Sequence, residues 1–158
     1  MASAWLVCLQ PRDDARVQLF CFPHAGGSPS AYAAWSEHLP EDIELWAINP
    51  PGRGSRIAEA PLESVQLLAE QIVEALRPHT SRSYAFVGHS LGALVAYEVT
   101  RRLEALRLSL PLLVFASAHA PPDVEVEEGE WIHTLGDAEL IEATKRWEFM
   151  PEDIAKDA

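Results

Sequence analysis

The pentapeptide Gly88-His89-Ser90-Leu91-Gly92 follows the apolar run Tyr84–Val87 and precedes a long segment with helical periodicity. A serine with a glycine two positions before it and two positions after it is typical of a sharp strand-to-helix turn that exposes the serine hydroxyl at the top of a sheet. Glycines are required because such a turn brings backbones too close together for a Cβ. The pattern alone arises by chance in about one chain in twenty of this length, so the strand and helix around it make it informative.

Short β-prone runs alternate with amphipathic segments on both sides of this turn. Strands are predicted at Trp5–Leu9, Val17–Phe22, Ile43–Asn49, Tyr84–Val87 and Leu112–Ala116. Helices are predicted from an N-cap at Ser30 to Pro40, from Leu62 to Leu76, and from Leu91 to Leu106. Turn residues between the first two strands predict that these strands form a hairpin. The alternation as a whole indicates an α/β fold with a mostly parallel sheet and helices on both faces.

Charge divides the chain into two regions. The net charge of the 158 residues is −12, and residues 121–158 hold 12 of the 24 acidic residues but 3 of the 12 basic ones. We therefore predict an α/β core over residues 1–120 and an acidic, helical, lid-like segment over residues 121–158. Nucleic acids and anionic membranes recruit clustered Lys and Arg, so neither is an expected partner.

Cysteine content and hydropathy indicate the environment. Cys8 and Cys21 fall inside predicted strands, where a free thiol packs as a small apolar side chain, so no disulfide is expected. The N-terminus lacks the basic start and apolar core of a secretory signal, and no apolar run approaches the ~20 residues of a membrane span. These features predict a cytoplasmic protein. Cys and His do not occur at ligand spacing, so no metal site is expected.

Ser90 is the candidate nucleophile, and the alternative is a structural serine at a tight turn. A nucleophilic serine needs a general base, and the substrate oxyanion needs hydrogen-bond donors. One donor is the backbone N–H of Leu91, at a helix N-terminus whose dipole favours negative charge. The second is expected from the Gly-rich loop Pro23–Ser28, where we choose the N–H of Ala25 and expect His24 and Gly26 to line the substrate site. The alternative is that the glycines only turn the chain.

Three motifs stand out together: L-F-C-F-P-H-A-G-G-S (Leu19–Ser28), N-P-P-G-R-G-S-R (Asn49–Arg56) and F-V-G-H-S-L-G-A-L-V-A-Y-E (Phe86–Glu98). With these motifs the chain resembles the external, or type II, thioesterases of polyketide and nonribosomal peptide assembly lines. The resemblance implies an α/β-hydrolase fold and the removal of unwanted acyl or aminoacyl groups from the phosphopantetheine arm of an acyl or peptidyl carrier protein. It also implies a Ser-Asp-His triad and no cofactor beyond the arm of the partner. Ser90 matches the nucleophile, and Leu91 and Ala25 match the oxyanion donors.

No residue matches the catalytic acid and histidine of that family. In an α/β-hydrolase these residues follow the nucleophile in the order Ser, acid, His, and in this family both come after the lid. The last histidine here is His133, within the lid-like segment. We therefore expect a fold that is incomplete at its C-terminus. We also expect weak or no hydrolysis by this chain alone, because an enzyme that lacks a triad member keeps only a residual rate.

Other polar residues are weaker candidates for these roles. His24 is a candidate base, His89 is expected to pack or orient, and Asp123, which follows His119 after the last predicted strand, is a candidate acid. The remaining histidines are expected on the surface or in the lid: His38, His79 and His133.

Two arginines and two further functions remain open. Arg53 and Arg56 either orient phosphopantetheine or belong to the turn that Pro50-Pro51 opens, and we favour the turn. A noncatalytic module that binds acyl groups or a carrier protein is one alternative function, favoured by the missing acid and histidine. A general serine esterase is the other, and the two loop motifs argue against it.

Overall fold

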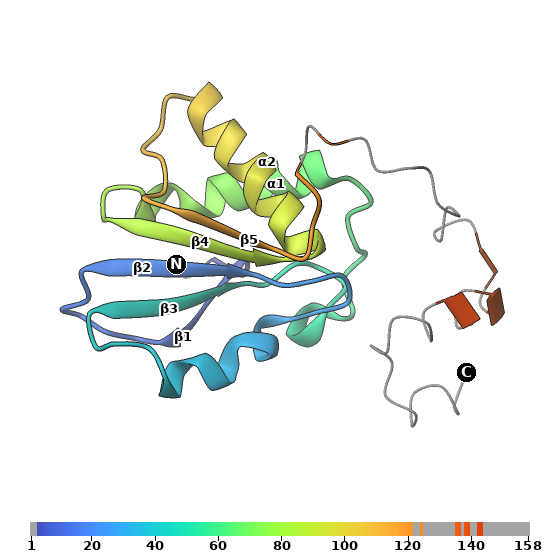
Figure 1. Cartoon of the computed structure of the whole chain (residues 1–158), viewed down its shortest axis with the longest axis horizontal. Coiled ribbons are helices and arrows are strands. Elements are labelled where there is room, and N and C mark those ends of the chain that lie inside the picture. Colours follow the sequence, from blue (N-terminus) through green and yellow to red (C-terminus); the bar gives the residue numbers. More distant parts are fainter. Residues whose placement is uncertain (1–2, 122–123, 125–134, 137, 140–141, 144–158) are drawn as a thin grey trace. The chain divides into compact units, whose positions relative to one another are not determined.

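The computed structural model describes residues 3–121, 124, 135–136, 138–139 and 142–143. Within them, five strands form one sheet in the order β1-β3-β2-β4-β5 (Figure 1). The strands are β1 (Leu6–Gln10), β2 (Val17–Phe22), β3 (Ile43–Ile48), β4 (Tyr84–His89) and β5 (Val114–Ser117). β1 runs antiparallel to β3, and the other neighbours are parallel. The predicted α/β class with a mostly parallel sheet is confirmed.

The predicted hairpin of the first two strands is wrong, because β3 lies between β1 and β2 in the sheet. Leu6 of β1 pairs with Ile48 of β3. The physical reason is burial: residues 20–22 of β2 are at most 1% exposed, so this strand needs cover on both faces and neighbours on both sides. The turn between β1 and β2 packs beside the start of β3, where a guanidinium nitrogen of Arg12 donates to the Leu39 carbonyl over 3.3 Å.

Two α-helices cover one face of the sheet, α1 (Val65–Leu76) and α2 (Leu91–Ala105) (Figure 1). Their buried residues fall at the helical period that the sequence shows, and they pack on the aromatic side chains of β2 and β4. The Ser64 hydroxyl caps α1 by accepting from the backbone N–H of Leu67 over 3.3 Å. The core on this face includes Phe20, Phe22, Ile72, Val73, Leu76, Phe86, Val99 and Leu103.

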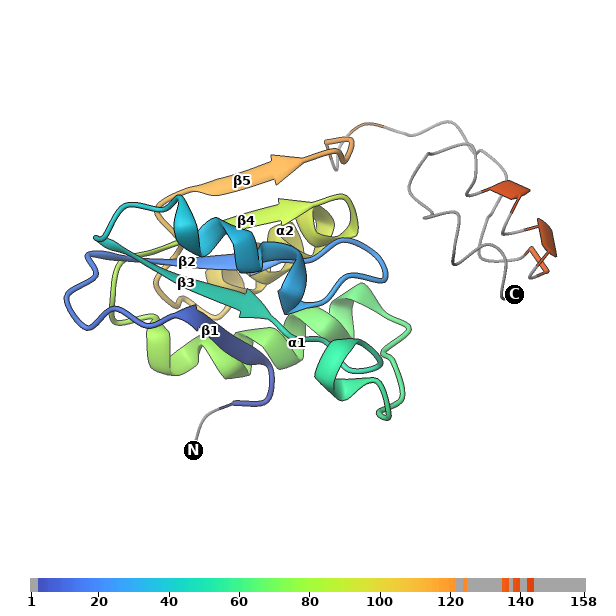
Figure 2. The ribbon, with the colours of Figure 1, turned by 90° about the horizontal axis from the view of Figure 1, so that it is seen from below.

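A 3-10 helix, η1 (Pro29–Glu37), packs on the opposite face (Figure 2). The predicted helix before Pro40 is thus present, but the prediction of Ser30 as its N-cap is wrong. Pro29 fixes the first helical position and Ser28 precedes it as the N-cap, while the Ser30 hydroxyl pairs with the Ser28 hydroxyl at 2.8 Å. Tyr32 anchors η1, because its buried hydroxyl donates to the Phe22 carbonyl over 2.8 Å. Two single 3-10 turns also lie within residues 3–121: η2 (Gly54–Arg56) and η3 (Arg77–His79).

A cluster of hydrogen-bonded polar side chains lies at the end of the sheet where β2 and β3 begin. The buried Gln18 amide nitrogen donates to Glu44 Oε2 over 2.7 Å and lies 3.3 Å from His79 Nδ1. Arg82 donates to the same Glu44 oxygen over 3.2 Å. Burial acts to raise the pKa of Glu44, but the hydrogen bonds and the Arg82 charge outweigh it and hold that pKa below its usual value. This end of the sheet is held by paired side chains.

His79 belongs to this cluster, so its predicted surface position is wrong. Its ring lies 4.8 Å from the Trp46 ring and 5.4 Å from the Phe20 ring, at steep angles to both. Burial against these aromatic rings lowers the pKa of His79, because it disfavours the imidazolium. The sequence around His79 resembles a solvated turn, and only the sheet order places two aromatic residues beside it.

The cysteines are free thiols, as predicted. Burial raises the pKa of Cys21 to about 12, so its thiol stays protonated and packs as an apolar group. Among the residues that the structure describes, no helix is long and apolar enough to cross a membrane.

Contacts divide the chain into the units Met1–His119 and Ala120–Ala158. Most of the second unit lies outside the described residues, including Asp123 and His133. The lid-like role of residues 121–158 stays a prediction.

Candidate active site

Ser90 lies at a strained turn between β4 and α2. Its φ of 53° and ψ of −122° are rare for a residue with a side chain, and such a backbone costs about 1–3 kcal/mol. A Cβ on Gly88 would lie 2.3 Å from the Gly92 carbonyl oxygen, and a Cβ on Gly92 would lie 2.1 Å from the Phe22 carbonyl oxygen. Neither contact is sterically possible. The structure thus confirms why the two glycines flank the serine.

The end of β5 supports this turn. The Ser90 N–H donates to the Ser117 carbonyl over 2.8 Å, and His89 Nδ1 lies 3.1 Å from the Ser117 hydroxyl oxygen. His89 is therefore engaged with β5, as expected of an orienting residue. Among the described residues, none hydrogen-bonds to the Ser90 hydroxyl, so the structure identifies no general base for it.

The Pro23–Ser28 loop follows β2 and makes a tight turn. The Gly27 N–H donates to the His24 carbonyl over 2.9 Å, and Gly26 has a φ of 77°. A positive φ at the third position of such a turn is characteristic of type II and requires glycine or asparagine. Gly26 therefore does turn the chain, and Gly27 is also constrained, because its Cβ would lie 3.0 Å from the His24 carbonyl oxygen.

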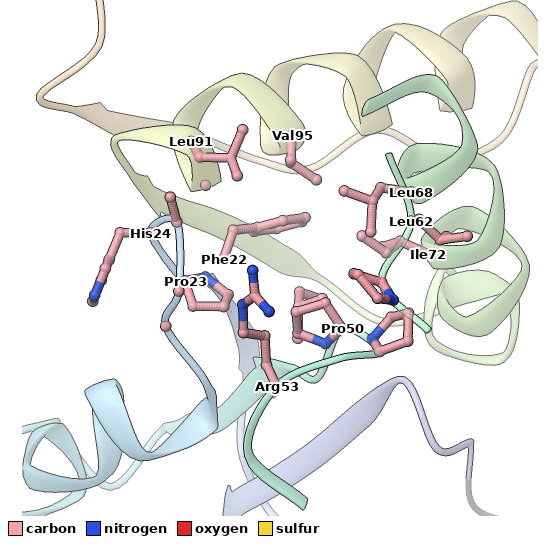
Figure 3. A pocket seen from close by; sticks show the side chains of 17 residues that line it. Phe22, Pro23, His24, Pro50, Arg53, Leu62, Leu68, Ile72, Leu91 and Val95 are labelled. Atoms are coloured by element: carbon pink, nitrogen blue, oxygen red, sulfur yellow. The ribbon is translucent and has the colours of Figure 1, made fainter. Parts of the chain in front are cut away.

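An apolar cavity of about 120 Å³ lies beside this loop (Figure 3). It brings together four of the predicted site residues, because His24, Ala25, Gly26 and Leu91 all line it, whereas Ser90 is not among its lining residues. The His24 imidazole points away from the other labelled side chains, whereas the Pro23 side chain of the same loop lies among them (Figure 3). Ala25 and Leu91, the predicted oxyanion donors, therefore border one apolar cavity, and apolar cavities with a few polar groups are typical of ligand sites.

Several walls of this cavity were not predicted as site residues. α1 contributes Leu68 and Ile72, α2 contributes Val95, and the chain before α1 contributes Leu62 (Figure 3). Helical periodicity marks the buried face of a helix, but it does not distinguish a residue in the solid core from one that borders a cavity. The sequence held no further signal for these positions.

The Asn49–Arg56 motif gives its two arginines different environments. Arg56 holds the turn together: it donates to the Asn49 carbonyl over 2.9 Å, pairs with Glu59 at 2.6 Å, and lies 4.7 Å from the centre of the Trp5 ring. Arg53 lines the cavity. The interpretation that both belong to the turn is thus supported for Arg56, whereas Arg53 also faces the cavity.

Two glycines bring this motif against its neighbours. Gly52 and Gly54 have φ values of 74° and 48°. A Cβ on Gly54 would lie 2.9 Å from the Ser28 Cβ, which shows how closely the motif packs against the Gly-rich loop.

Among the described residues, no group of three or more His, Cys, Asp or Glu is placed to hold a metal ion.

The comparisons with known proteins agree with this geometry. The family model of the thioesterase domain matches residues 17–158. The gramicidin S biosynthesis protein GrsT of Aneurinibacillus migulanus is 34% identical over 156 residues, which cover 99% of this chain and 60% of that protein.

Two solved structures are similar over most of the chain. The type II thioesterase BorB from the borrelidin biosynthetic cluster has a TM-score of 0.80 and 33% identity, over 94% of this chain and 62% of that one. The type II thioesterase YbtT from the yersiniabactin NRPS/PKS pathway has a TM-score of 0.81 and 28% identity, over 97% of this chain and 61% of that one. This chain therefore spans less than two thirds of the length of these relatives. It belongs to the thioesterase domain family, and its relatives include type II thioesterases of nonribosomal peptide and polyketide biosynthesis.

Proposed function

We propose that this chain carries the nucleophile and the oxyanion donors of a thioesterase that hydrolyses acyl or aminoacyl thioesters on the phosphopantetheine arm of a carrier protein. The observation that carries the proposal is the strained strand-to-helix turn at Ser90, called the elbow below. A side chain at a φ of 53° between two sterically required glycines is costly to maintain, and strained positions of this kind cluster at active sites. The family supplies the reaction class, and the names of its relatives supply the biosynthetic setting.

The proposed chemistry begins with attack of Ser90 Oγ on the thioester carbonyl carbon. Formation of the Oγ–C bond gives a tetrahedral oxyanion; the C–S bond breaks as this intermediate collapses, and the hydroxyl proton leaves with the pantetheine thiol. The backbone N–H groups of Ala25 and Leu91 hold the oxyanion, and the positive end of the α2 dipole adds to the stabilisation. Water then hydrolyses the acyl-serine. The arm belongs to the carrier, so the chain itself needs no cofactor.

The general base and the acid are not assigned among the described residues. His89 is engaged by Ser117, the His24 imidazole points away from the cavity, and Asp123 lies outside the described residues. We therefore expect acylation by this chain to be slow. The same observation favours a second candidate function, a noncatalytic module that binds acyl groups through the apolar cavity.

The test is an acylation assay with an acyl-pantetheine thioester, followed by intact-protein mass measurement. The unaltered chain is expected to gain one acyl group, and Ser90→Ala is expected to gain none. Ser36→Ala is the matched control, because it removes the hydroxyl of a serine in η1 on the opposite face of the sheet. Equal acylation of the unaltered chain and Ser90→Ala would refute the nucleophile. Binding of the thioester without acylation of either would favour the binding module.

A further inference from the structure

The two proposed oxyanion donors belong to different segments of the chain. Leu91 follows Ser90 at the start of α2, and Ala25 lies in the Pro23–Ser28 loop after β2. Both N–H groups must point at one oxygen and lie about 2.7–3.1 Å from it. Stabilisation of the oxyanion therefore depends on how firmly the loop is held against the elbow.

The loop contains a closed turn that carries the first donor. The Gly27 N–H donates to the His24 carbonyl over 2.9 Å, and this bond closes the turn around Ala25 and Gly26. Because the bond fixes the shape of the turn, a displacement of His24 carries the Ala25 N–H with it. The position of this donor is thus set by the contacts that hold His24.

Gly92 makes the first contact between the loop and the elbow. A Cβ on Gly92 would lie 2.1 Å from the Phe22 carbonyl oxygen and 2.7 Å from the Pro23 carbonyl oxygen, so the two backbones touch. This contact fixes the base of the loop, where β2 ends. It does not reach the turn beyond Pro23.

His89 makes the second contact, on the other side of Ser90. Its ring lies edge to face with the His24 ring, with the ring centres 6.2 Å apart and the ring planes at 84°. Aromatic rings favour this geometry. The His24 imidazole points away from the cavity, so the contact does not occupy the substrate space (Figure 3). It holds the residue directly before Ala25.

Ser117 orients the His89 ring from the end of β5. Its hydroxyl oxygen lies 3.1 Å from His89 Nδ1, and its carbonyl accepts from the Ser90 N–H over 2.8 Å. A side chain that is packed on one side and hydrogen-bonded on another keeps one orientation. One residue of β5 therefore fixes both the backbone of the nucleophile and the ring that holds the loop.

We propose that His89 is a positioning residue, which holds the Gly-rich loop so that the Ala25 and Leu91 N–H groups converge on one oxygen. The proposal rests on the oxyanion donors proposed above, and it assigns His89 no part in proton transfer. Such a residue acts on the rate of acylation and not on substrate binding, because the donors bind the oxyanion more strongly than the carbonyl that precedes it.

The test measures acylation of Ser90 by the butanoyl thioester and the butanoyl dithioester of N-acetylcysteamine, followed by intact-protein mass. The dithioester carries sulfur in place of the carbonyl oxygen, and sulfur is a weak hydrogen-bond acceptor. It therefore gains little from the two amide donors. The thioester-to-dithioester ratio of acylation rates reports on these donors, whereas a loss of folded protein lowers both rates equally.

His89→Ala is expected to lower this ratio roughly tenfold, a part of the ~100-fold or more that removal of a whole donor costs. The half-saturating thioester concentration should stay unchanged. Ser117→Ala should lower the ratio less, and Ser117→Thr, which keeps the hydroxyl, should retain the ratio of the unaltered chain. In a chain that already carries His89→Ala, Ser117→Ala should have no further effect.

His38→Ala is the matched control, because it removes an exposed imidazole at the end of η1. It should leave the ratio unchanged. An equal fall of both rates in His89→Ala would overturn the proposal, since the ring would then only stabilise the fold.

A second measurement does not need acylation. The butanoyl thioester is added to the Ser90→Ala chain, and the backbone amide signals of Ala25 and Leu91 are followed by NMR spectroscopy. Both signals are expected to shift. When His89→Ala is added, the shift should be lost at Ala25 and retained at Leu91, and equal shifts with and without His89 would overturn the proposal.

The two proposals fail separately. Loss of the Ala25 shift in His89→Ala, without acylation of Ser90 in the unaltered chain, would refute the nucleophile and leave the positioning role standing. Acylation of Ser90 with a ratio that does not depend on His89 would do the reverse.

Discussion

The two ends of β2 are built in opposite ways. At its beginning, the Gln18 amide nitrogen contacts both Glu44 and His79, and Arg82 donates to Glu44. Among the described residues, the buried Gln18 Oε1 has no hydrogen-bond partner. At its end, the chain enters the Gly-rich loop, and the shape is fixed by backbone contacts and positive φ angles. We call the beginning of β2 the paired end, and its hydrogen-bonded side chains stabilise the sheet there. Beside the other end, the Ser90 hydroxyl has no hydrogen-bond partner among the described residues.

The largest expected effect comes from closing the space at the end of β2. Gly92→Ala places a Cβ 2.1 Å from the Phe22 carbonyl oxygen, so the α2 N-terminus or β2 must move. We expect a loss of about 3 kcal/mol or more in the free energy of unfolding, measured by urea titration. Gly136→Ala is the control, because a Cβ there meets no atom of the described residues within 4 Å. Equal stabilities for the two variants would contradict the described contact.

A smaller loss is expected from breaking the paired end. Glu44→Ala removes the acceptor of the Gln18 amide and of Arg82, and leaves a buried donor unmatched. The expected cost is about 2 kcal/mol in the same titration. Asp42→Ala is the control, since its carboxylate is half exposed and lies 3.9 Å from Arg16, a pair expected to contribute little. If both substitutions cost the same, the cluster does not stabilise the sheet.

Relief of strain at the elbow is expected to raise stability. Ser90→Gly places a residue without a Cβ at a φ of 53°, so the free energy of unfolding should increase by about 1 kcal/mol. The same variant should lose acylation. Ser36→Gly is the control within η1, where glycine is expected to destabilise slightly. A loss of stability in Ser90→Gly would show that the backbone at Ser90 is not strained.

The smallest effect is a pH dependence at the paired end. Burial lowers the pKa of His79 below its ordinary 6.5, with Glu44 acting to raise it and Arg82 to lower it. Below pH 6.5 the unfolded chain therefore binds a proton that the folded chain resists, and stability falls as the pH falls. Between pH 7.5 and 5.5 the unaltered chain should lose more stability than His79→Phe. His38→Phe, at an exposed histidine, should lose as much as the unaltered chain, and equal losses in all three would contradict the assignment.

The sequence predicted the features that depend on local sterics. The glycines at 88 and 92 could be interpreted at once, because the clash they avoid is set by a strand that passes directly into a helix. The order of the sheet could not be predicted in the same way. β1 and β2 are joined by turn residues that suit a hairpin, and what separates them is the need of β2 for neighbours on both sides.

The sequence predicted which two loops form the candidate site, but not which side chains line its cavity. Ala25 and Leu91 follow from the two motifs, and both line the cavity. Arg53 and Arg56 lie three residues apart in one motif. Arg56 pairs with Glu59, three residues further along the chain, whereas only the tertiary structure places Arg53 at the cavity wall. The burial of His79 could not be predicted either, because its aromatic neighbours Phe20 and Trp46 come from strands distant in the sequence.

β5 is an edge strand of the sheet, and its Ser117 carbonyl accepts a hydrogen bond from the Ser90 N–H. Val114 and Phe115 of this strand are 39% and 53% exposed, so little buried surface holds it in place. A strand of this kind opens locally at lower free-energy cost than the centre of the sheet. Each opening frees the Ser90 amide from the Ser117 carbonyl, so the hydrogen-exchange rate of that one amide reports how often the elbow loosens. Any surface that covers β5 will therefore slow this exchange and rigidify the elbow without touching Ser90.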